Sequence, residues 1–321
     1  MMDSTARAPH DFGTTGSRRR WHRPGGAMRA FEYFEPATLA EASAMLHRCG
    51  GKASVLAGGT DLLVQIKESV RKPEQVINLK KIPGMDVLTF DPVNGLRIGA
   101  LVTTRAVETS GLVQRHYAGL AKAVTDFASI QVRHRATVVG NVCRASPSAD
   151  SIAPLVADGA SVHLYGMSGS RELRVEDFVT GVGKTAIAPD EIVTRITVPP
   201  PRANTGKVYL KHGRRVQMEL ATVGVAVSLT LEDGHCADAG IVLAAVGPTP
   251  VRAARAEQLL RGQRVTDALI LQAAHAAMDE ARPISDVRAS AAYRRQMVSV
   301  LTRRALEQAL EAALRGASCE K

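Results

Sequence analysis

Apolar and polar positions along the chain alternate between two patterns. From Met28 onward, short apolar runs typical of buried strands are separated by segments with helical periodicity. The spacing of Thr38 and Glu41 fits a capping box, which predicts a helix ending near Arg48, before Gly50. Further helices are predicted over 62–68, 117–128 and 150–158, and strands over 53–56, 75–79, 96–101, 161–165, 171–175 and 191–198.

A break in this pattern divides the chain. The run Pro199-Pro200-Pro201-Arg202-Ala203-Asn204 is incompatible with regular structure and predicts a domain boundary. Beyond it, strands are predicted over 208–211, 221–232 and 237–246, and amphipathic helices over 252–260, 267–281 and 290–314. We therefore expect a domain at 28–202, a smaller domain at 203–314 and a tail at 315–321. A length of 321 residues agrees with about two domains.

Residues 1–27 differ from the rest of the chain. They are rich in Arg, Gly, Ser, Thr and Pro and have no apolar period, so we expect a disordered extension. No apolar segment follows Arg18-Arg19-Arg20, which argues against a twin-arginine export signal. Apolar runs such as 221–229 are too short for a transmembrane helix. A cytoplasmic location is expected.

The net charge of +10, from 41 basic and 31 acidic residues, raises the possibility of a nucleic-acid partner. Five arginines and two aspartates within 1–27 supply +3 of this charge, and the remaining +7 is spread over 294 residues without a long basic run. Aromatic residues make up only 4 %, which leaves few platforms for base stacking. We therefore expect no nucleic-acid partner.

The four cysteines, Cys49, Cys143, Cys236 and Cys319, are scattered and form no CxxC pair. Zinc ribbons and iron–sulfur clusters need clustered thiolates, so we expect no metal site on this chain. Isolated thiols fit a reducing compartment.

Two glycine-containing segments are the candidate binding sites. Ala57-Gly58-Gly59-Thr60-Asp61 follows a predicted strand and precedes a predicted helix, where adjacent glycines let the backbone approach an anion such as a phosphate. The segment matches neither the GxGxxG fingerprint nor a P-loop, and a plain turn is the alternative.

The second segment is Thr137-Val138-Val139-Gly140-Asn141, which we interpret as another glycine turn. Asn141 tolerates left-handed geometry and can hydrogen-bond to backbone or ligand. Asp150 follows, either as a helix cap or as an acceptor for a ribose or an adenine amine. Two such turns about 80 residues apart favour one ligand with two phosphates.

Taken together, these motifs resemble the FAD-binding medium subunit of the molybdenum hydroxylases, a family that includes xanthine dehydrogenase and aerobic carbon monoxide dehydrogenase. The resemblance rests on residues 57–61, 131–141 and 146–150, on the opening segment 28–38, and on segments 209–215 and 286–295. It covers residues 28 to 314. Two positions depart from the family pattern: Val139 replaces a second glycine, and Glu219 stands where Asp is frequent.

The resemblance implies an α+β fold: a two-lobed FAD-binding domain of the vanillyl-alcohol-oxidase (PCMH) type, followed by a smaller α+β domain with a three-stranded sheet and helices. It also implies the FAD contacts. The pyrophosphate is assigned to Val55, Leu56, Ala57, Gly58, Gly59, Thr60, Asp61 and Leu62, and the phosphate and ribitol to Thr137, Val138, Val139, Gly140 and Asn141. Phe127 is assigned to the flavin, Asp150 to the adenosine, Val193 to an apolar backbone contact and Lys211 to the isoalloxazine edge.

The function that the resemblance implies is electron transfer in a heterotrimer. A large partner would carry molybdopterin, a small partner would carry iron–sulfur clusters, and the FAD held here would pass electrons to an external acceptor such as NAD, a quinone or oxygen. No acid–base pair or nucleophile on this chain indicates a catalytic residue of its own. Two alternatives remain, a stand-alone flavin oxidase and a flavin-free interaction subunit.

Overall fold

A short parallel sheet forms the first lobe, residues 29–82. The computed structural model describes residues 19–20, 29–215 and 218–319. The strand order is β1-β2-β4-β3, with β2, β4 and β3 parallel and β1 antiparallel on the edge. The elements are β1 (Arg19–Arg20), β2 (Glu32–Phe34), α1 (Leu39–Cys49), β3 (Ala53–Leu56), α2 (Leu62–Lys67), β4 (Gln75–Asn78) and the 3-10 turn η1 (Leu79–Lys81). Apart from Arg19 and Arg20, the segment predicted to be disordered lies outside the described residues.

Helix α1 confirms the capping prediction. The Thr38 hydroxyl accepts a hydrogen bond from the Glu41 N–H at 3.1 Å, and the Glu41 carboxylate accepts one from the Ala37 N–H at 3.0 Å. Gly50 ends the helix with a φ of 53°. These bonds satisfy backbone donors that the first turn of a helix leaves without partners.

An antiparallel sheet of order β5-β6-β11-β7-β8 forms the second lobe, residues 83–202. Its strands are β5 (Leu88–Asp91), β6 (Gly95–Gly99), β7 (Ser161–Gly166), β8 (Gly169–Arg174) and β11 (Ile192–Val198), and a separate hairpin pairs β9 (Val179–Gly181) with β10 (Lys184–Thr185). The helices are α3 (Thr104–Thr109), α4 (Gly111–His116), α5 (Ala118–Thr125), α6 (Ile130–Arg133), α7 (Val138–Arg144), α8 (Ile152–Ala157) and α9 (Val175–Phe178).

Helix α5 is shorter than predicted. The expected helix over 117–128 ends at Thr125, because the backbone turns at Ala128 into the left-handed region with a φ of 47°. Ser129 then caps α6 by accepting a hydrogen bond from the Val132 N–H at 3.4 Å. An apolar pattern that continues through 128 hides this loop from sequence analysis.

The C-terminal part, residues 203–319, is a four-stranded antiparallel sheet covered on one face by three helices. Its order β12-β13-β14-β15 comprises β12 (Thr205–His212), β13 (Val223–Glu232), β14 (His235–Ala244) and the two-residue β15 (Val251–Arg252). The sequence predicts three strands, and β15 is the added one. The helices are α10 (Ala254–Leu260), α11 (Asp267–Glu280) and α12 (Ala291–Cys319), the last of which extends beyond its predicted end at Leu314.

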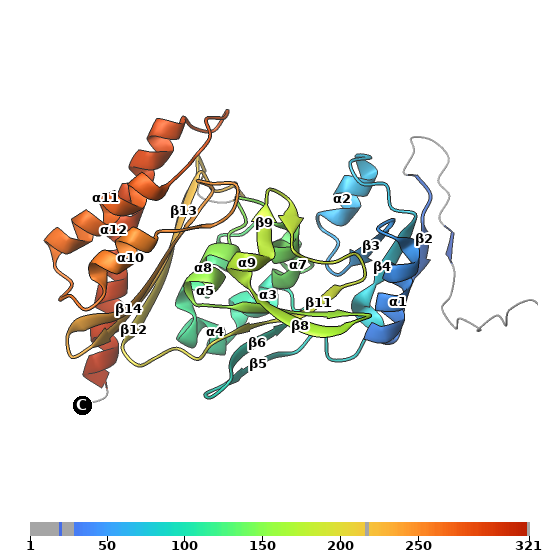
Figure 1. Ribbon diagram of the computed structural model, residues 1–321, viewed down its shortest axis with the longest axis horizontal. Helices are drawn as coiled ribbons and strands as arrows, with labels where there is room; N and C mark the ends of the chain where they lie inside the picture. The colour runs from blue at the N-terminus through green and yellow to red at the C-terminus, as the bar shows by residue number, and fades with distance from the viewer. Residues whose placement is uncertain (1–18, 21–28, 216–217, 320–321) are drawn as a thin grey trace, which may run out of the picture.

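Both faces of this sheet are buried. Val223, Val225 and Val227 belong to one core with α10, α11 and α12. Tyr209 and Ala226 belong to a second core, which continues into both lobes. Helices α5 and α8 pack against the sheet from that second side, and Figure 1 shows the two lobes and the C-terminal part following one another along the long axis. The α+β fold predicted from the sequence is confirmed.

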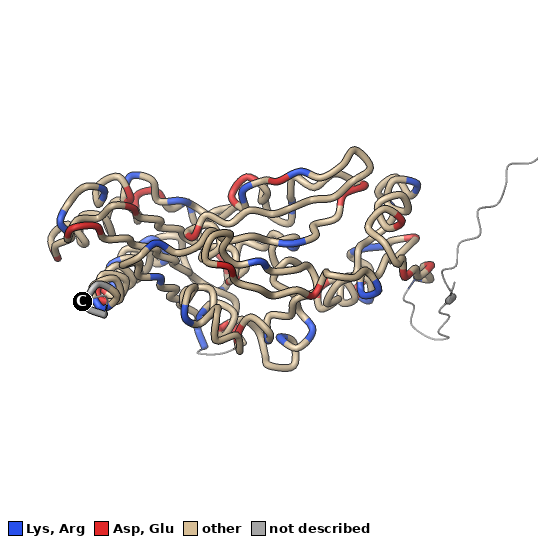
Figure 2. Tube along the Cα trace, turned by 90° about the horizontal axis from the view of Figure 1, so that it is seen from below, with Lys and Arg blue, Asp and Glu red and all other residues tan. Residues whose placement is uncertain are grey.

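Two other properties of the whole chain bear on function. None of the helices in the described residues is both long and apolar enough to cross a membrane. Figure 2 shows Lys and Arg distributed along the described chain with Asp and Glu between them.

Candidate functional site

A cavity of about 410 Å³ lies between the two lobes and brings the two glycine-containing segments together. The first segment comes from the loop between β3 and α2, and the second from the start of α7. Thirteen of the residues predicted from the sequence line the cavity: Val55, Ala57, Gly58, Gly59, Thr60, Asp61, Leu62, Phe127, Thr137, Val139, Gly140, Asn141 and Val193.

Four predicted residues do not line the cavity. Leu56 and Val138 are buried in the hydrophobic cores, at 9 % and 0 % exposure. Asp150 and Lys211 lie in a separate buried cluster, described below.

The first glycine turn packs directly against the backbone that precedes the second segment. A Cβ atom on Gly58 would lie 2.1 Å from the Arg135 carbonyl oxygen, so only glycine allows this approach. Gly59 has a φ of 78°, in the region that L side chains rarely adopt. Asp61 precedes α2 but makes no side-chain cap bond to it. The turn thus presents backbone and the Asp61 carboxylate to the cavity rather than bulky side chains.

The second segment is the first turn of a helix, and its interpretation as a glycine turn is wrong. Thr137 caps α7 by accepting a hydrogen bond from the Gly140 N–H at 3.0 Å. Val139 is helical and 3 % exposed, and its φ is not positive. A helical position tolerates a β-branched residue far better than a left-handed turn does. The departure at Val139 therefore carries no backbone strain.

Asn141 fixes the next turn of this helix. Its side-chain oxygen accepts a hydrogen bond from the Ser151 hydroxyl at 2.7 Å, and both residues are buried. Ser151, rather than Asp150, occupies the cap position of α8. The bond ties α7 to α8 behind the cavity wall.

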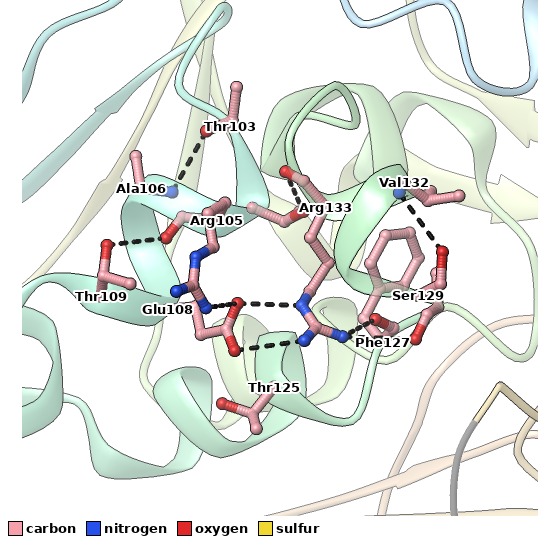
Figure 3. A network of polar contacts seen from close by, with 12 residues as sticks. Thr103, Arg105, Ala106, Glu108, Thr109, Thr125, Phe127, Ser129, Val132 and Arg133 are labelled. Atoms are coloured by element: carbon pink, nitrogen blue, oxygen red, sulfur yellow. Dashed lines mark hydrogen bonds and ion pairs between the residues drawn. The ribbon is translucent and has the colours of Figure 1, made fainter.

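Phe127 reaches the cavity from the loop 126–129, which a buried arginine supports (Figure 3). Arg133 donates to the Phe127 carbonyl oxygen at 2.9 Å and to the Ala128 carbonyl oxygen at 3.3 Å. Its guanidinium also donates to both carboxylate oxygens of Glu108, at 2.9 and 3.3 Å. Bidentate pairs of this kind restrict the side chain to one orientation.

Asp150, Lys211 and Tyr209 form the separate buried cluster. Lys211 donates to Asp150 Oδ2 at 2.9 Å and to the Asp126 carbonyl oxygen at 3.1 Å, and the Tyr209 hydroxyl donates to Asp150 Oδ1 at 2.8 Å. Burial raises the pKa of Asp150, and the adjacent Lys211 ammonium opposes that rise. Burial and the Asp150 carboxylate together raise the pKa of Tyr209 well above its usual value.

Several residues of the cavity wall were missed by sequence analysis. Arg144, on α7, pairs with Asp61 at 3.3 Å and so connects the two lobes. Cys143 precedes it, and burial raises the pKa of its thiol to about 12. Other missed residues of the wall are Gln65, Arg71, Thr185, Ile187, Ala188, Pro189, Glu191 and Ile192. Arg144 lies three residues after the second segment, and the basic residue beside that motif was the available signal.

Within the described residues, no group of three or more His, Cys, Asp or Glu side chains is arranged to hold a metal ion. Cys49, Cys143 and Cys236 are free thiols. The cavity wall consists of backbone, apolar side chains, a few hydroxyls, the Cys143 thiol, Gln65 and the charged residues Asp61, Arg71, Arg144 and Glu191.

Comparison with known protein families gives two matches. Residues 29–201 match the FAD binding domain in molybdopterin dehydrogenase, and residues 208–309 match the CO dehydrogenase flavoprotein C-terminal domain. The first match includes every residue of the cavity wall.

Relatives match over nearly their full length. The carbon monoxide dehydrogenase medium chain of Afipia carboxidovorans is 32 % identical over 87 % of this chain and 96 % of its own. A putative xanthine dehydrogenase FAD-binding subunit of Escherichia coli K12 is 29 % identical over 88 % of this chain and 96 % of its own. A solved carbon monoxide dehydrogenase chain from Hydrogenophaga pseudoflava superimposes with a TM-score of 0.84 at 33 % identity, covering 88 % of this chain and 98 % of its own.

These comparisons identify the family of the chain. Its members are FAD-binding subunits of dehydrogenases, and molybdopterin and iron–sulfur clusters are held by other subunits of these complexes. The chain belongs to the family of FAD-binding medium subunits of molybdenum hydroxylases, and it is the flavoprotein subunit of an oxidoreductase.

Proposed function

We propose that this chain holds FAD in the cavity between its lobes and serves as the electron-transfer subunit of a heterotrimer. Electrons would arrive from iron–sulfur clusters on a small partner subunit and leave to an external acceptor. The observation that carries the proposal is the cavity itself, in which the turn after β3 meets the start of α7. One cavity wall with two glycine-containing backbone segments suits a ligand with a pyrophosphate.

The residues of the wall fit the parts of FAD. The turn containing Gly58 and Gly59 lines the cavity and is proposed to offer its backbone to the pyrophosphate, because neither residue carries a side chain. Thr137 and Asn141, at the start of α7, are proposed to face the phosphate and ribitol. Phe127 and Val193 supply apolar contacts of the kind that a flavin ring requires. When bound, FAD supplies the redox chemistry, and the protein supplies binding and orientation.

Lys211 and Asp150 enter the proposal differently. They lie outside the cavity wall, so their proposed role toward FAD is indirect. The domain division that we propose, 28–202 for FAD and 203–314 for the second domain, does not separate them functionally, because their ion pair crosses it.

The partners are proposed to be a large molybdopterin subunit, where the substrate is hydroxylated, and a small iron–sulfur subunit. The described cysteines are free and scattered, which agrees with clusters held elsewhere and with a reducing, cytoplasmic location. Neither a nucleic acid nor a membrane is part of the proposal.

Flavin retention tests the cavity assignment. Gly59→Val places a β-branched residue at a φ of 78° and should abolish retention of FAD, measured as flavin released per chain after purification. Gly111→Val is the matched control, because a Cβ there meets nothing within 4 Å. Full flavin occupancy in Gly59→Val would show that the turn is misassigned.

Assembly tests the electron-transfer role. The chain should co-purify with the large and small subunits when the three genes are expressed together. In that complex the bound flavin should be reduced by one of a panel of substrates comprising xanthine, nicotinate, carbon monoxide and glyceraldehyde. Failure to assemble would contradict the proposal, and substrate oxidation by the isolated chain would favour a stand-alone oxidase.

A further inference from the structure

We infer that Lys211 and Arg133 are positioning residues for the flavin site, which together hold the loop that presents Phe127 to the cavity. The inference rests on the proposed binding of FAD there. It assigns to the C-terminal part of the chain a direct influence on the shape of a cavity that it does not line.

The loop between α5 and α6 contains a residue in an unfavourable backbone conformation. Helix α5 ends at Thr125 and α6 begins at Ile130, so residues 126–129 lie between regular elements. Ala128 adopts a φ of 47°, an unfavourable conformation for a residue with a side chain. A conformation of this kind persists only where surrounding contacts hold it.

Two largely buried cations supply such contacts. Lys211 donates to the Asp126 carbonyl oxygen, and Arg133 donates to those of Phe127 and Ala128. Three successive carbonyl groups, those flanking and including Phe127, are thus fixed from two sides. Because the carbonyls cannot rotate away from these cations, the Phe127 ring is held at the cavity wall.

Each cation is itself held by a carboxylate. Glu108 binds Arg133 through both oxygens, with side-chain exposures of 11 % and 12 %. Asp150 binds Lys211, with side-chain exposures of 5 % and 9 %. Asp150 is held in turn by the Tyr209 hydroxyl, which comes from the same strand as Lys211. The two pairs are therefore rigid supports rather than mobile surface charges.

The position of Lys211 distinguishes direct contact with the flavin from an indirect, positioning role. An ammonium group that contacts the flavin must line the cavity, whereas Lys211 does not line it and faces Asp150 and the Asp126 carbonyl. The Asp150 carboxylate also offsets the charge of Lys211. Its effect on the flavin is therefore transmitted through the loop, by the placement of Phe127.

Strand β12 offers a matched control. Lys207 lies four residues before Lys211, on the same strand, and forms an ion pair with Asp158 that is equally buried, at 8 % and 4 % exposure. It makes no contact with loop 126–129. Lys207→Met and Lys211→Met each remove one buried cation and leave one buried carboxylate, so their losses of stability should be similar.

The measurement is FAD binding to the full-length apoprotein, followed by flavin fluorescence, together with the visible circular dichroism of the bound flavin. Lys211→Met should weaken FAD binding about tenfold and change the dichroism, whereas Lys207→Met should stay within about twofold of the unmodified chain. Arg133→Gln should likewise weaken FAD binding about tenfold and change the dichroism. Arg105→Gln is its control, because Arg105 pairs with Glu108 at 3.0 Å but does not reach the loop.

The decisive test is to make the Lys211 substitution in a chain that already carries Phe127→Ala. If Lys211 acts through Phe127, Lys211→Met should cause little further loss of affinity in the Phe127→Ala chain. Full additivity of the two substitutions would overturn the inference, as would equal FAD affinities for Lys207→Met and Lys211→Met. If Lys211→Met does not fold, the uncharged pair Asp150→Asn with Lys211→Met replaces it. Absence of FAD binding by the unmodified chain would instead overturn the proposed function.

Discussion

The Asp61–Arg144 pair joins the two lobes at the cavity wall. Asp61 ends the turn proposed to meet the pyrophosphate, so its negative charge opposes an anionic ligand there. The Arg144 side chain offsets that charge, because its Nε lies 3.3 Å from Asp61 Oδ1. The pair is therefore placed to influence ligand affinity more than folding.

Arg144→Gln should lower FAD affinity about tenfold, equivalent to about 1.4 kcal/mol. The free energy of unfolding should change by less than about 1 kcal/mol, because the two side chains are 41 % and 55 % exposed. Fluorescence titration and urea unfolding measure the two effects.

Arg174→Gln is the control for this substitution, since Arg174 is similarly exposed at 47 % and pairs with Glu176 away from the cavity. An unchanged affinity in Arg144→Gln would show that the anion does not lie near Arg144.

The rate of alkylation of Cys143, which lies in the same cavity wall, should depend on pH. The thiol pKa of about 12 leaves roughly one thiolate in ten thousand at pH 8, and only the thiolate reacts with alkylating agents. Alkylation by iodoacetamide, measured by mass spectrometry of the Cys143 peptide, should be slow at pH 8 and about tenfold faster for each added pH unit.

Bound FAD should slow that alkylation further, because Cys143 lines the cavity. Fast labelling at pH 7, or labelling indifferent to FAD, would contradict this placement of the thiol.

Site residues with a distinctive backbone requirement can be recognised in the sequence. Site residues that depend on tertiary contacts cannot. Gly58 and Gly59 are recognisable because two adjacent glycines indicate close approach or positive φ. Arg144 and Cys143 carry no such local mark, and their place in the wall depends on how α7 meets the first lobe. Lys211 was found by resemblance, but its partners come from residues 61 and 85 positions away.

At the level of elements, long strands and helices were predicted better than short ones, and the short strands β2, β5, β9, β10 and β15 were not predicted. The strand over 53–56 matches β3 residue for residue, because four apolar or small residues between a glycine pair and a turn leave few alternatives. Helices α3, α4, α6 and α7 were missed. They have four to seven residues each and depend on caps such as Thr103 and Thr137.

The packing of α8 on β14 provides a test at this scale. A Cβ on Gly240 would lie 2.6 Å from the Ala157 carbonyl oxygen, so Gly240→Ala forces the strand and the helix apart. We expect a loss of about 1–3 kcal/mol in the free energy of unfolding, as in other overpacked interiors. Urea unfolding measures it.

Gly111→Ala adds the same methyl group where nothing lies within 4 Å, and it should change stability far less. Equal stabilities for these two variants would mean that the approach of α8 to β14 is not tight.

At the level of the molecule, one hydrophobic core extends from α1 through the second lobe to the sheet of the C-terminal part. Because this core is shared, we expect the described parts to unfold together rather than one by one. The proposed FAD site exists only in the folded chain, so FAD should stabilise the whole chain by about 2.7 kcal/mol at a concentration of 100 times its Kd.

Calorimetry with and without FAD tests this coupling. A single transition that shifts upward with FAD is expected, and a second transition indifferent to FAD would show that the C-terminal part unfolds independently.

The two lysines of β12, Lys207 and Lys211, limit which parts of such chains can be exchanged between relatives. They supply the counterions of Asp150 and Asp158, which belong to the preceding domain. A gene fragment that ended before β12 would leave both carboxylates buried without a cation and would uncover α5 and α8. We therefore expect an exchange of the C-terminal part between relatives to give a stable chain only where the two lysines and the two aspartates are kept together.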